Sequence, residues 1–210
     1  MKGLLLSIAT FLMFSSPVFC EIIKDISEKH DKQGTIFLKS SSVPFSGILI
    51  DSSYKGILKP KETYDNGILH GEIIKCYEDG NVEARGTYAN GHKDGIWVSY
   101  YKNGQISNIE HFSKGMLNGE WVSYYENGLL KSKGKFINGR KEGNWKFYYD
   151  NGKINIITSY IKDELQGPYN FFSRNGAKQI EGHYNLGIKT KVWRFFNEKG
   201  EHIKSLTYSY

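Results

Sequence analysis

The chain has 210 residues, a length that suits one domain, with a formal net charge of +6 and a sequence pI of about 9.1. Lysines and acids are interleaved along the whole chain without a Lys/Arg run, which argues against the clustered basic face of a nucleic-acid-binding protein. Aromatic residues make up 15%, and 23 glycines stand against 4 prolines, a composition typical of β-strands joined by tight turns.

Residues 1–20 are predicted to be a signal peptide. Lys2 gives a positively charged start, and an apolar stretch follows at residues 4–14. This stretch is shorter than the roughly 20 residues of a membrane-spanning helix, so we expect cleavage after Cys20 and no integral membrane span afterwards. The alternative is a bacterial lipoprotein lipidated at Cys20, although the bulky Phe19 stands where a lipobox has a small residue.

Residues 21–42 carry many charged side chains and are predicted to be a polar leader. Within them, the apolar run Ile36-Phe37-Leu38 is a candidate edge strand. Export and cleavage would leave Cys76 as the single cysteine, so no internal disulfide can form. Cys76 occupies a repeat position that tyrosine fills in later units, and we expect it to be a packed residue rather than a nucleophile.

A repeat of 24 residues occupies residues 43–210, in about seven units. Three turn series, almost entirely glycine, and one aromatic series recur at this interval without insertion or deletion. The glycine series begin at Gly47, Gly56 and Gly67, and the two clearest departures from them are Asp163 and Lys191. The aromatic series is Tyr64, Tyr88, Phe112, Phe136, Tyr160, Tyr184 and Tyr208.

Each unit contains two turn signals. Asn-Gly pairs such as Asn103-Gly104 predict two-residue type I′ turns, because both central residues need positive φ. A second set, which includes Asn66-Gly67, marks the other turn of each unit. Two turns in each unit leave strands of about six to eight residues. The sequence therefore predicts an all-β fold of tandem β-hairpins that forms an elongated, twisted antiparallel meander of about fourteen strands.

A two-residue turn at Asn103-Gly104 also predicts the hairpin register, with Tyr101 opposite Ile106. The remaining predicted pairs are Ser99 with Asn108, Trp97 with Glu110, Tyr125 with Leu130, Ser123 with Ser132, Trp121 with Gly134, Trp145 with Thr158, Gly119 with Phe136, and Gly95 with Phe112. Large rings thus face small residues in several units, which avoids clashes across the strands.

Strand alternation places many rings on one face, which we name the aromatic face. It carries two rows, Trp97, Trp121, Trp145, Tyr169 and Trp193 in one and Tyr77, Tyr101, Tyr125 and Tyr149 in the other. The opposite face is mixed, with Val98, Tyr100, Val122, Tyr124 and Tyr148 beside Glu83, Arg85, Lys131 and Lys133. A flat sheet with a bare aromatic face would aggregate, so we expect a strongly twisted sheet or an open groove about 60 Å long, with atypical end units.

The residues of one unit resemble a known family. They are Gly119-Glu120-Trp121, Tyr124-Tyr125-Glu126-Asn127-Gly128, Lys133-Gly134-Lys135-Phe136 and Asn138-Gly139. This pattern resembles the MORN-repeat variant of bacterial YwqK-like proteins, which are often labelled antitoxins. The resemblance covers about residues 43–210 and implies stacked antiparallel hairpins with a role in protein or membrane contact. The antitoxin label implies a cytosolic toxin partner, which conflicts with a signal peptide.

No catalytic, metal or cofactor site is expected. The six histidines lack metal-ligand spacing, and the chain has no nucleophile elbow and no phosphate-binding loop before a helix. The aromatic rows remain as a candidate site. They form either the core or a surface that binds sugars or a protein, since both ligands favour Trp and Tyr. The candidate binding residues are Trp97, Trp121, Trp145, Trp193, Tyr101, Tyr125 and Tyr149.

The sequence favours an exported, non-enzymatic repeat scaffold that binds another protein at the cell envelope or outside the cell. One alternative is an envelope module for glycans or phospholipid head groups, suggested by the aromatic rows and the mild positive charge. Another is an antitoxin-like partner that neutralises a toxin. No cofactor and no nucleic-acid partner are expected.

Overall fold

The computed structural model describes residues 23–55 and 58–209. The predicted signal peptide at residues 1–20, with Cys20 and the expected cleavage site before Glu21, lies outside the described residues.

The described chain forms one long antiparallel sheet, as the repeat predicts. Of its 16 strands, all but β1 and β14 follow one another in a single up-and-down meander of fourteen strands. The prediction of an all-β hairpin meander is therefore confirmed. The strands of the meander are β4 (Gly47–Ile50), β5 (Lys61–Asp65), β6 (Ile68–Cys76), β7 (Val82–Ala89), β8 (His92–Tyr100), β9 (Ile106–Ser113), β10 (Met116–Tyr124), β11 (Leu130–Ile137), β12 (Arg140–Tyr148), β13 (Ile154–Ile161), β15 (Gly167–Phe172), β16 (Lys178–Asn185), β17 (Ile188–Phe196) and β18 (His202–Tyr208).

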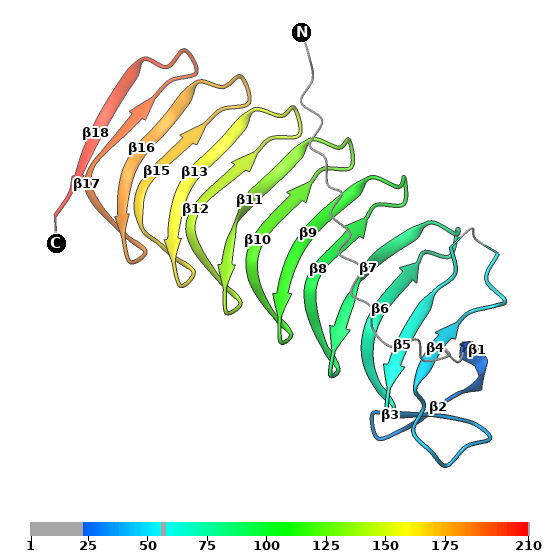
Figure 1. The fold of residues 1–210 in the computed structure, drawn as a ribbon. Coiled ribbons are helices and arrows are strands. Elements are labelled where there is room, and N and C mark those ends of the chain that lie inside the picture. The colour runs from blue at the N-terminus through cyan, green and yellow to red at the C-terminus, as the bar shows by residue number, and fades with distance from the viewer. Residues whose placement is uncertain (1–22, 56–57, 210) are drawn as a thin grey trace, which may run out of the picture.

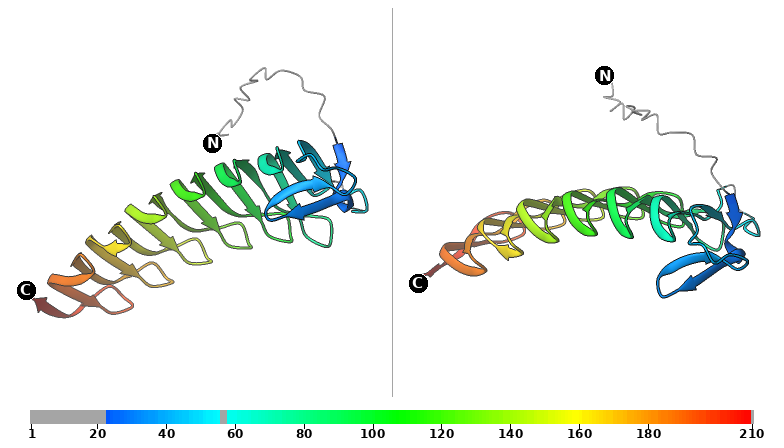
Figure 2. Two further views of the ribbon diagram at one scale, coloured as in Figure 1. Left: turned by 90° about the horizontal axis from the view of Figure 1, so that it is seen from below. Right: turned by 60° about the horizontal axis from the view of Figure 1, so that its bottom comes forward.

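The molecule is elongated, with the two ends of the described chain at opposite ends of the sheet (Figure 1). Each strand is bent along its length, so successive hairpins form a row of arcs rather than a flat sheet (Figure 2). Side chains of neighbouring strands contact one another on the aromatic face, as the Trp121 and Trp145 rings do at a centroid distance of 5.6 Å, so the single-layer sheet covers part of its own apolar surface.

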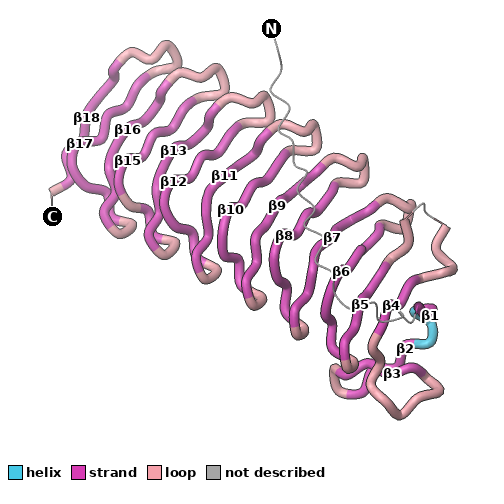
Figure 3. The backbone as a smooth tube through the Cα atoms, viewed as in Figure 1, coloured by secondary structure: helices cyan, strands magenta, loops and turns pink. Residues whose placement is uncertain are grey.

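The two long edges of the sheet carry different turns (Figure 3). Along one edge lie two-residue type I′ turns; Asn66 has φ 48° and Gly67 has φ 77°. Along the other edge the Gly104 N–H donates to the Tyr101 carbonyl at 2.9 Å, and the Tyr101 N–H donates to the Gln105 carbonyl at 2.8 Å. These bonds define a three-residue loop, a type I turn that ends on a left-handed glycine. The type I′ prediction for Asn103-Gly104 is therefore wrong.

The three-residue loop also changes the register close to the turn. Tyr100 faces Ile106, and Tyr124 faces Leu130, so the predicted Tyr101–Ile106 and Tyr125–Leu130 pairs are wrong by one residue. The predicted register returns after this one pair, because the second strand then contains a β-bulge. The one extra residue of the bulge compensates for the one extra residue of the loop. All the other predicted pairs are confirmed: Trp97–Glu110, Ser99–Asn108, Trp121–Gly134, Ser123–Ser132, Trp145–Thr158, Gly119–Phe136 and Gly95–Phe112.

A second irregularity lies between the hairpins, and the sequence analysis did not predict it. Between β11 and β12, Lys135 faces Glu142 but Lys133 faces Lys146, so the pairing shifts by two residues. Shifts of the same kind occur between β5 and β6, β7 and β8, and β16 and β17. The glycine series that begins at Gly47 lies here, and Gly95, for example, has φ 69°. These glycines therefore permit the bulge, and Lys191 adopts the same kind of backbone with φ 62°.

The N-terminal end of the sheet is covered by a folded cap. The cap consists of β1 (Ile23–Asp25), the 3₁₀ helix η1 (Ile26–Glu28), β2 (Lys29–Lys32) and β3 (Thr35–Leu38). The strand that extends the sheet edge is β1, which pairs in parallel with β4. The run at residues 36–38 does form a strand, but β3 pairs with β2 in a separate two-stranded sheet. Ile36 joins Phe45, Leu49 and Tyr64 in a buried cluster, so the predicted polar leader contributes to the core.

Candidate functional site

Three indoles of the first aromatic row are core residues. Trp97, Trp145 and Trp193 are 2%, 1% and 2% exposed. Each lies on a glycine of the preceding strand: a methyl group would come within 2.3 Å of the Trp97 ring at Gly86, 2.2 Å of Trp145 at Gly134 and 2.2 Å of Trp193 at Gly182. For these three residues the core alternative holds, because they have almost no surface left to offer a ligand.

The other two members of the row lack this glycine seat. The glycine under each buried indole lies 11 residues before it in the chain. At the same distance before Trp121 the residue is Glu110, and before Tyr169 it is Thr158. Both rings are half-buried, and each contacts an indole of the next repeat. The ring centroids of Trp121 and Trp145 are 5.6 Å apart, and those of Tyr169 and Trp193 are 5.7 Å apart. The structural unit is therefore a pair of repeats, or 48 residues, with one buried and one half-buried ring.

Lysine side chains follow the same two-repeat period. The ammonium of Lys93 lies 4.1 Å from the centre of the Trp97 ring, that of Lys141 lies 5.0 Å from Trp145 and that of Lys189 lies 4.5 Å from Trp193. The position is leucine in the intervening repeats, at Leu69, Leu117 and Leu165. Burial lowers the pKa of Lys93 although Glu110 acts in the opposite direction. The three buried indoles thus carry cation–π sites at regular intervals of 48 residues.

The second aromatic row holds neighbouring repeats together. Each tyrosine hydroxyl donates to a backbone carbonyl of the next unit: Tyr77 to Tyr100 at 2.7 Å, Tyr101 to Tyr124 at 2.7 Å, Tyr125 to Tyr148 at 2.8 Å and Tyr149 to Phe172 at 2.8 Å. The hydroxyl groups of these half-buried rings are therefore already engaged within the protein. Their candidate role in binding stays a prediction.

The structure thus separates the predicted binding residues. Trp121 and Trp145 are in contact, whereas Trp97 and Trp193 lie in different two-repeat units, and the tyrosines lie near the three-residue turns. Of the four predicted tryptophans, Trp121 alone is not buried. A ligand on the aromatic face would therefore meet Trp121, lysines and half-buried ring edges rather than a continuous row of exposed indoles.

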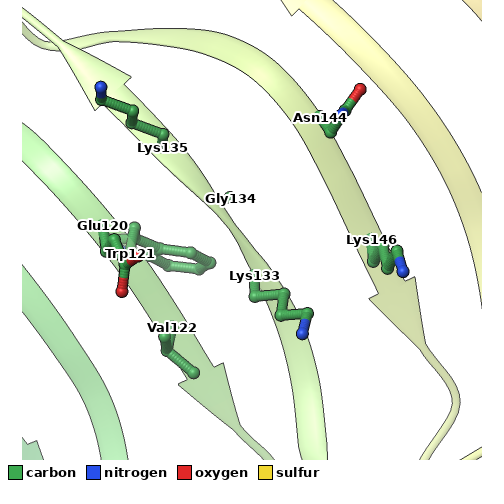
Figure 4. Close-up of a pocket in the computed structure, with 8 residues that line it drawn as sticks. All are labelled: Glu120, Trp121, Val122, Lys133, Gly134, Lys135, Asn144 and Lys146. Atoms are coloured by element: carbon green, nitrogen blue, oxygen red, sulfur yellow. The ribbon is translucent and has the colours of Figure 1, made fainter.

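The opposite face carries a feature that sequence reasoning missed. A shallow hollow of about 390 Å³ lies over β10 to β12 (Figure 4). Its lining residues on this face are Glu120, Val122, Lys133, Lys135, Asn144 and Lys146, and the intervening Trp121 and Gly134, a pair on the aromatic face, complete the lining. A hollow of about 360 Å³ recurs 48 residues later, where Arg194 and Glu181 form an ion pair at 2.9 Å. A regular register would place Asn144 opposite Lys133, so only the bulge reveals the Lys133–Lys146 pair.

Two kinds of site are absent from the part of the chain that the structure describes. Residues 23–55 and 58–209 contain no group of three or more His, Cys, Asp or Glu that could hold a metal ion. Over the same residues, no helix has the length and apolar content needed to cross a membrane.

The fold and both faces define a tandem β-hairpin repeat protein whose side chains on these surfaces suit binding. The family model for the MORN repeat variant matches residues 93–114, 117–138 and 141–162. These three consecutive repeats are therefore MORN repeat variants, as the sequence resemblance predicts, and they include the hollow at Lys133 and Lys146. A comparison with curated proteins found no match to the chain.

Proposed function

We propose that this protein is a non-enzymatic repeat scaffold that binds another protein, and that it is exported to do so at the cell envelope or outside the cell. The observation that carries the binding role is the use of the aromatic face as core, which leaves the opposite face for a partner. That face exposes apolar side chains, with Ile96 55% and Val192 38% exposed. Apolar groups spread among charged ones along a long rigid sheet are typical of protein-binding surfaces.

The proposal of export rests on the N-terminal sequence, with its positive start and short apolar stretch. Expression of the full chain with a C-terminal tag, followed by cell fractionation and N-terminal sequencing, tests it. We expect an envelope or extracellular product that begins at Glu21. A cytosolic product that retains residues 1–20 would contradict export and would favour the antitoxin-like alternative.

Site-specific photocrosslinking tests the binding face. A photoreactive phenylalanine analogue would replace Glu120 in one variant and Trp121 in another, because these neighbours project from opposite faces of β10. We expect a discrete protein adduct from position 120 in cells that produce the native partner. Adducts from position 121 alone would show that the aromatic face is the binding surface.

A second candidate function is an envelope module for an anionic glycan or a phospholipid head group. The observation in its favour is the regular spacing of Lys93, Lys141 and Lys189 over ring faces on the aromatic face. Lipid or glycan adducts from position 121, with binding that weakens as salt rises, would support this candidate over the protein scaffold.

A further inference from the structure

Two lysines face each other directly across β11 and β12 on the face opposite the aromatic rows. Lys133 pairs with Lys146, and their side chains extend from adjacent strands in Figure 4. The Cβ atoms of directly opposed residues lie about 4.5–5.5 Å apart, and like charges at this distance are destabilising. The pair is therefore a local electrostatic cost to the folded chain.

Among the described residues, no acidic side chain forms an ion pair with either lysine. The other cross-strand neighbour of Lys133 is Val122, and that of Lys146 is Ile157. Glu120 on β10 and Glu142 on β12 both face Lys135 instead. Two cations thus lie together between two apolar side chains, in a row that crosses four strands and spans about 15 Å.

The fold does not require two cations at this position. The equivalent cross-strand pairs in the other repeats are Lys61–Ile74, Arg85–Val98, Ile109–Val122, Ile157–Asn170 and Glu181–Arg194. Three of these pairs contain one cation, which faces an apolar residue or an acid. The other two pairs contain no cation. The repeat therefore departs from its own pattern at the hollow, and the missing negative charge points to a ligand.

We propose that this hollow binds an extended acidic segment of the partner protein, with one carboxylate between Lys133 and Lys146. The inference rests on the proposed scaffold function and specifies the chemistry of the partner. Lys135 lies two residues from Lys133 on the same face, but it faces Glu120 on one side and Glu142 on the other, so the lysine pair is the anchor for the carboxylate. Glu120 at the rim disfavours a uniformly anionic lipid surface.

Fluorescence anisotropy with the full mature chain tests the proposal. The probe is a fluorescein-labelled octapeptide of alternating Glu and Leu, and a Lys-Leu octapeptide is the control probe. We expect the acidic peptide to bind and its affinity to fall as salt rises. The double variant Lys133→Gln/Lys146→Gln should bind it about tenfold more weakly or worse. The matched variant Lys39→Gln/Lys199→Gln loses the same charge at exposed sites elsewhere and should stay within about twofold.

A second variant guards against a folding defect. Lys133→Glu recreates the acid–cation pair that Glu181 and Arg194 form in a later repeat, so it should fold at least as stably while losing the peptide. Equal affinity in the wild type and either hollow variant would overturn the inference but leave the photocrosslinking test of the scaffold unaffected. Binding of anionic phospholipid vesicles or inorganic phosphate through these lysines, without binding of the peptide, would also overturn it.

Discussion

The glycine under each buried indole explains why the tryptophans of one row differ in exposure. Gly86, Gly134 and Gly182 have no side chain, so the ring of the next strand lies directly on their backbone. Where Glu110 or Thr158 takes this place, the following ring is only half-buried. A single glycine in each second repeat thus decides whether an aromatic ring belongs to the core or to the surface.

Substitution of Gly134 by alanine should destabilise the protein by about 2 kcal/mol, because the new methyl group would lie 2.2 Å from the buried Trp145 ring. Chemical denaturation followed by tryptophan fluorescence measures the loss. Glu110→Ala is the matched control, since it occupies the same place one repeat earlier beneath the half-buried Trp121, and we expect it to be nearly neutral. Equal effects of the two substitutions would contradict the two-repeat unit.

At the level of elements, the same dipeptide Asn-Gly serves two different turns. In the type I′ turn, Asn138 has φ 50°, so asparagine is present for its tolerance of left-handed backbone. In the three-residue loop, the Asn127 side chain accepts from the Leu129 N–H at 3.0 Å and donates to the Asp150 carbonyl of the next repeat at 2.7 Å. Asparagine is needed there for its side-chain hydrogen bonds and not for its φ.

Replacement by glycine distinguishes the two roles. Asn138→Gly should change the free energy of unfolding by less than about 0.5 kcal/mol, because glycine adopts positive φ without strain. Asn127→Gly should cost about 1–2 kcal/mol, because two hydrogen bonds are lost, one of which joins adjacent repeats. Thermal unfolding of the two variants side by side measures the difference. A larger loss for Asn138→Gly would reverse the assignment of the turns.

The register could be predicted near the strand centres but not at the bulges. Pairs such as Trp121–Gly134 follow from the repeat and strand alternation, and the structure confirms them. The shift that brings Lys133 opposite Lys146 depends on positive-φ glycines that are equally compatible with a turn. The buried state of Trp145 likewise depends on Gly134, a residue in the adjacent strand. For these reasons the fold was predictable, whereas the hollow and the core role of three indoles required the three-dimensional pairing.

At the scale of the whole molecule, the N-terminal end of the sheet is covered by the cap, whereas the edge strand at the other end, β18, is open. At the N-terminal end, the Lys29 ammonium contacts the Glu62 carboxylate at 2.9 Å, and the Tyr64 hydroxyl donates to the same carboxylate at 2.8 Å. Burial, reinforced by Glu62 and opposed by Lys29, raises the pKa of Tyr64 to about 12. Burial acts to lower the pKa of Lys29, but its interactions with Tyr64 and Glu62 outweigh this effect and raise the pKa. The cap therefore joins the first repeat through a polar network as well as through its apolar cluster.

This network should weaken in alkaline solution. Below the unfolded pKa of 10.0, Tyr64 is protonated in both states; between that value and about 12 the unfolded chain loses the proton while the folded chain keeps it. The free energy of unfolding therefore falls as pH rises through this window. The raised pKa of Lys29 acts in the same direction at high pH. In a spectrophotometric titration, the difference between wild type and Tyr64→Phe should show one tyrosine that ionises near pH 12. A difference with its midpoint near 10 would contradict the network.

The other end of the sheet presents an open strand. Within the described residues β18 pairs with β17 alone, and six of its seven residues are exposed, whereas β11 lies between β10 and β12. Because an edge strand bonds to a neighbour on one side only, about half of its amides are open to water. Hydrogen exchange followed by mass spectrometry should therefore show β18 exchanging orders of magnitude faster than β11, at a rate independent of protein concentration. If β18 were as well protected as β11, and its protection rose with protein concentration, a strand from another copy would have to cover this edge in solution.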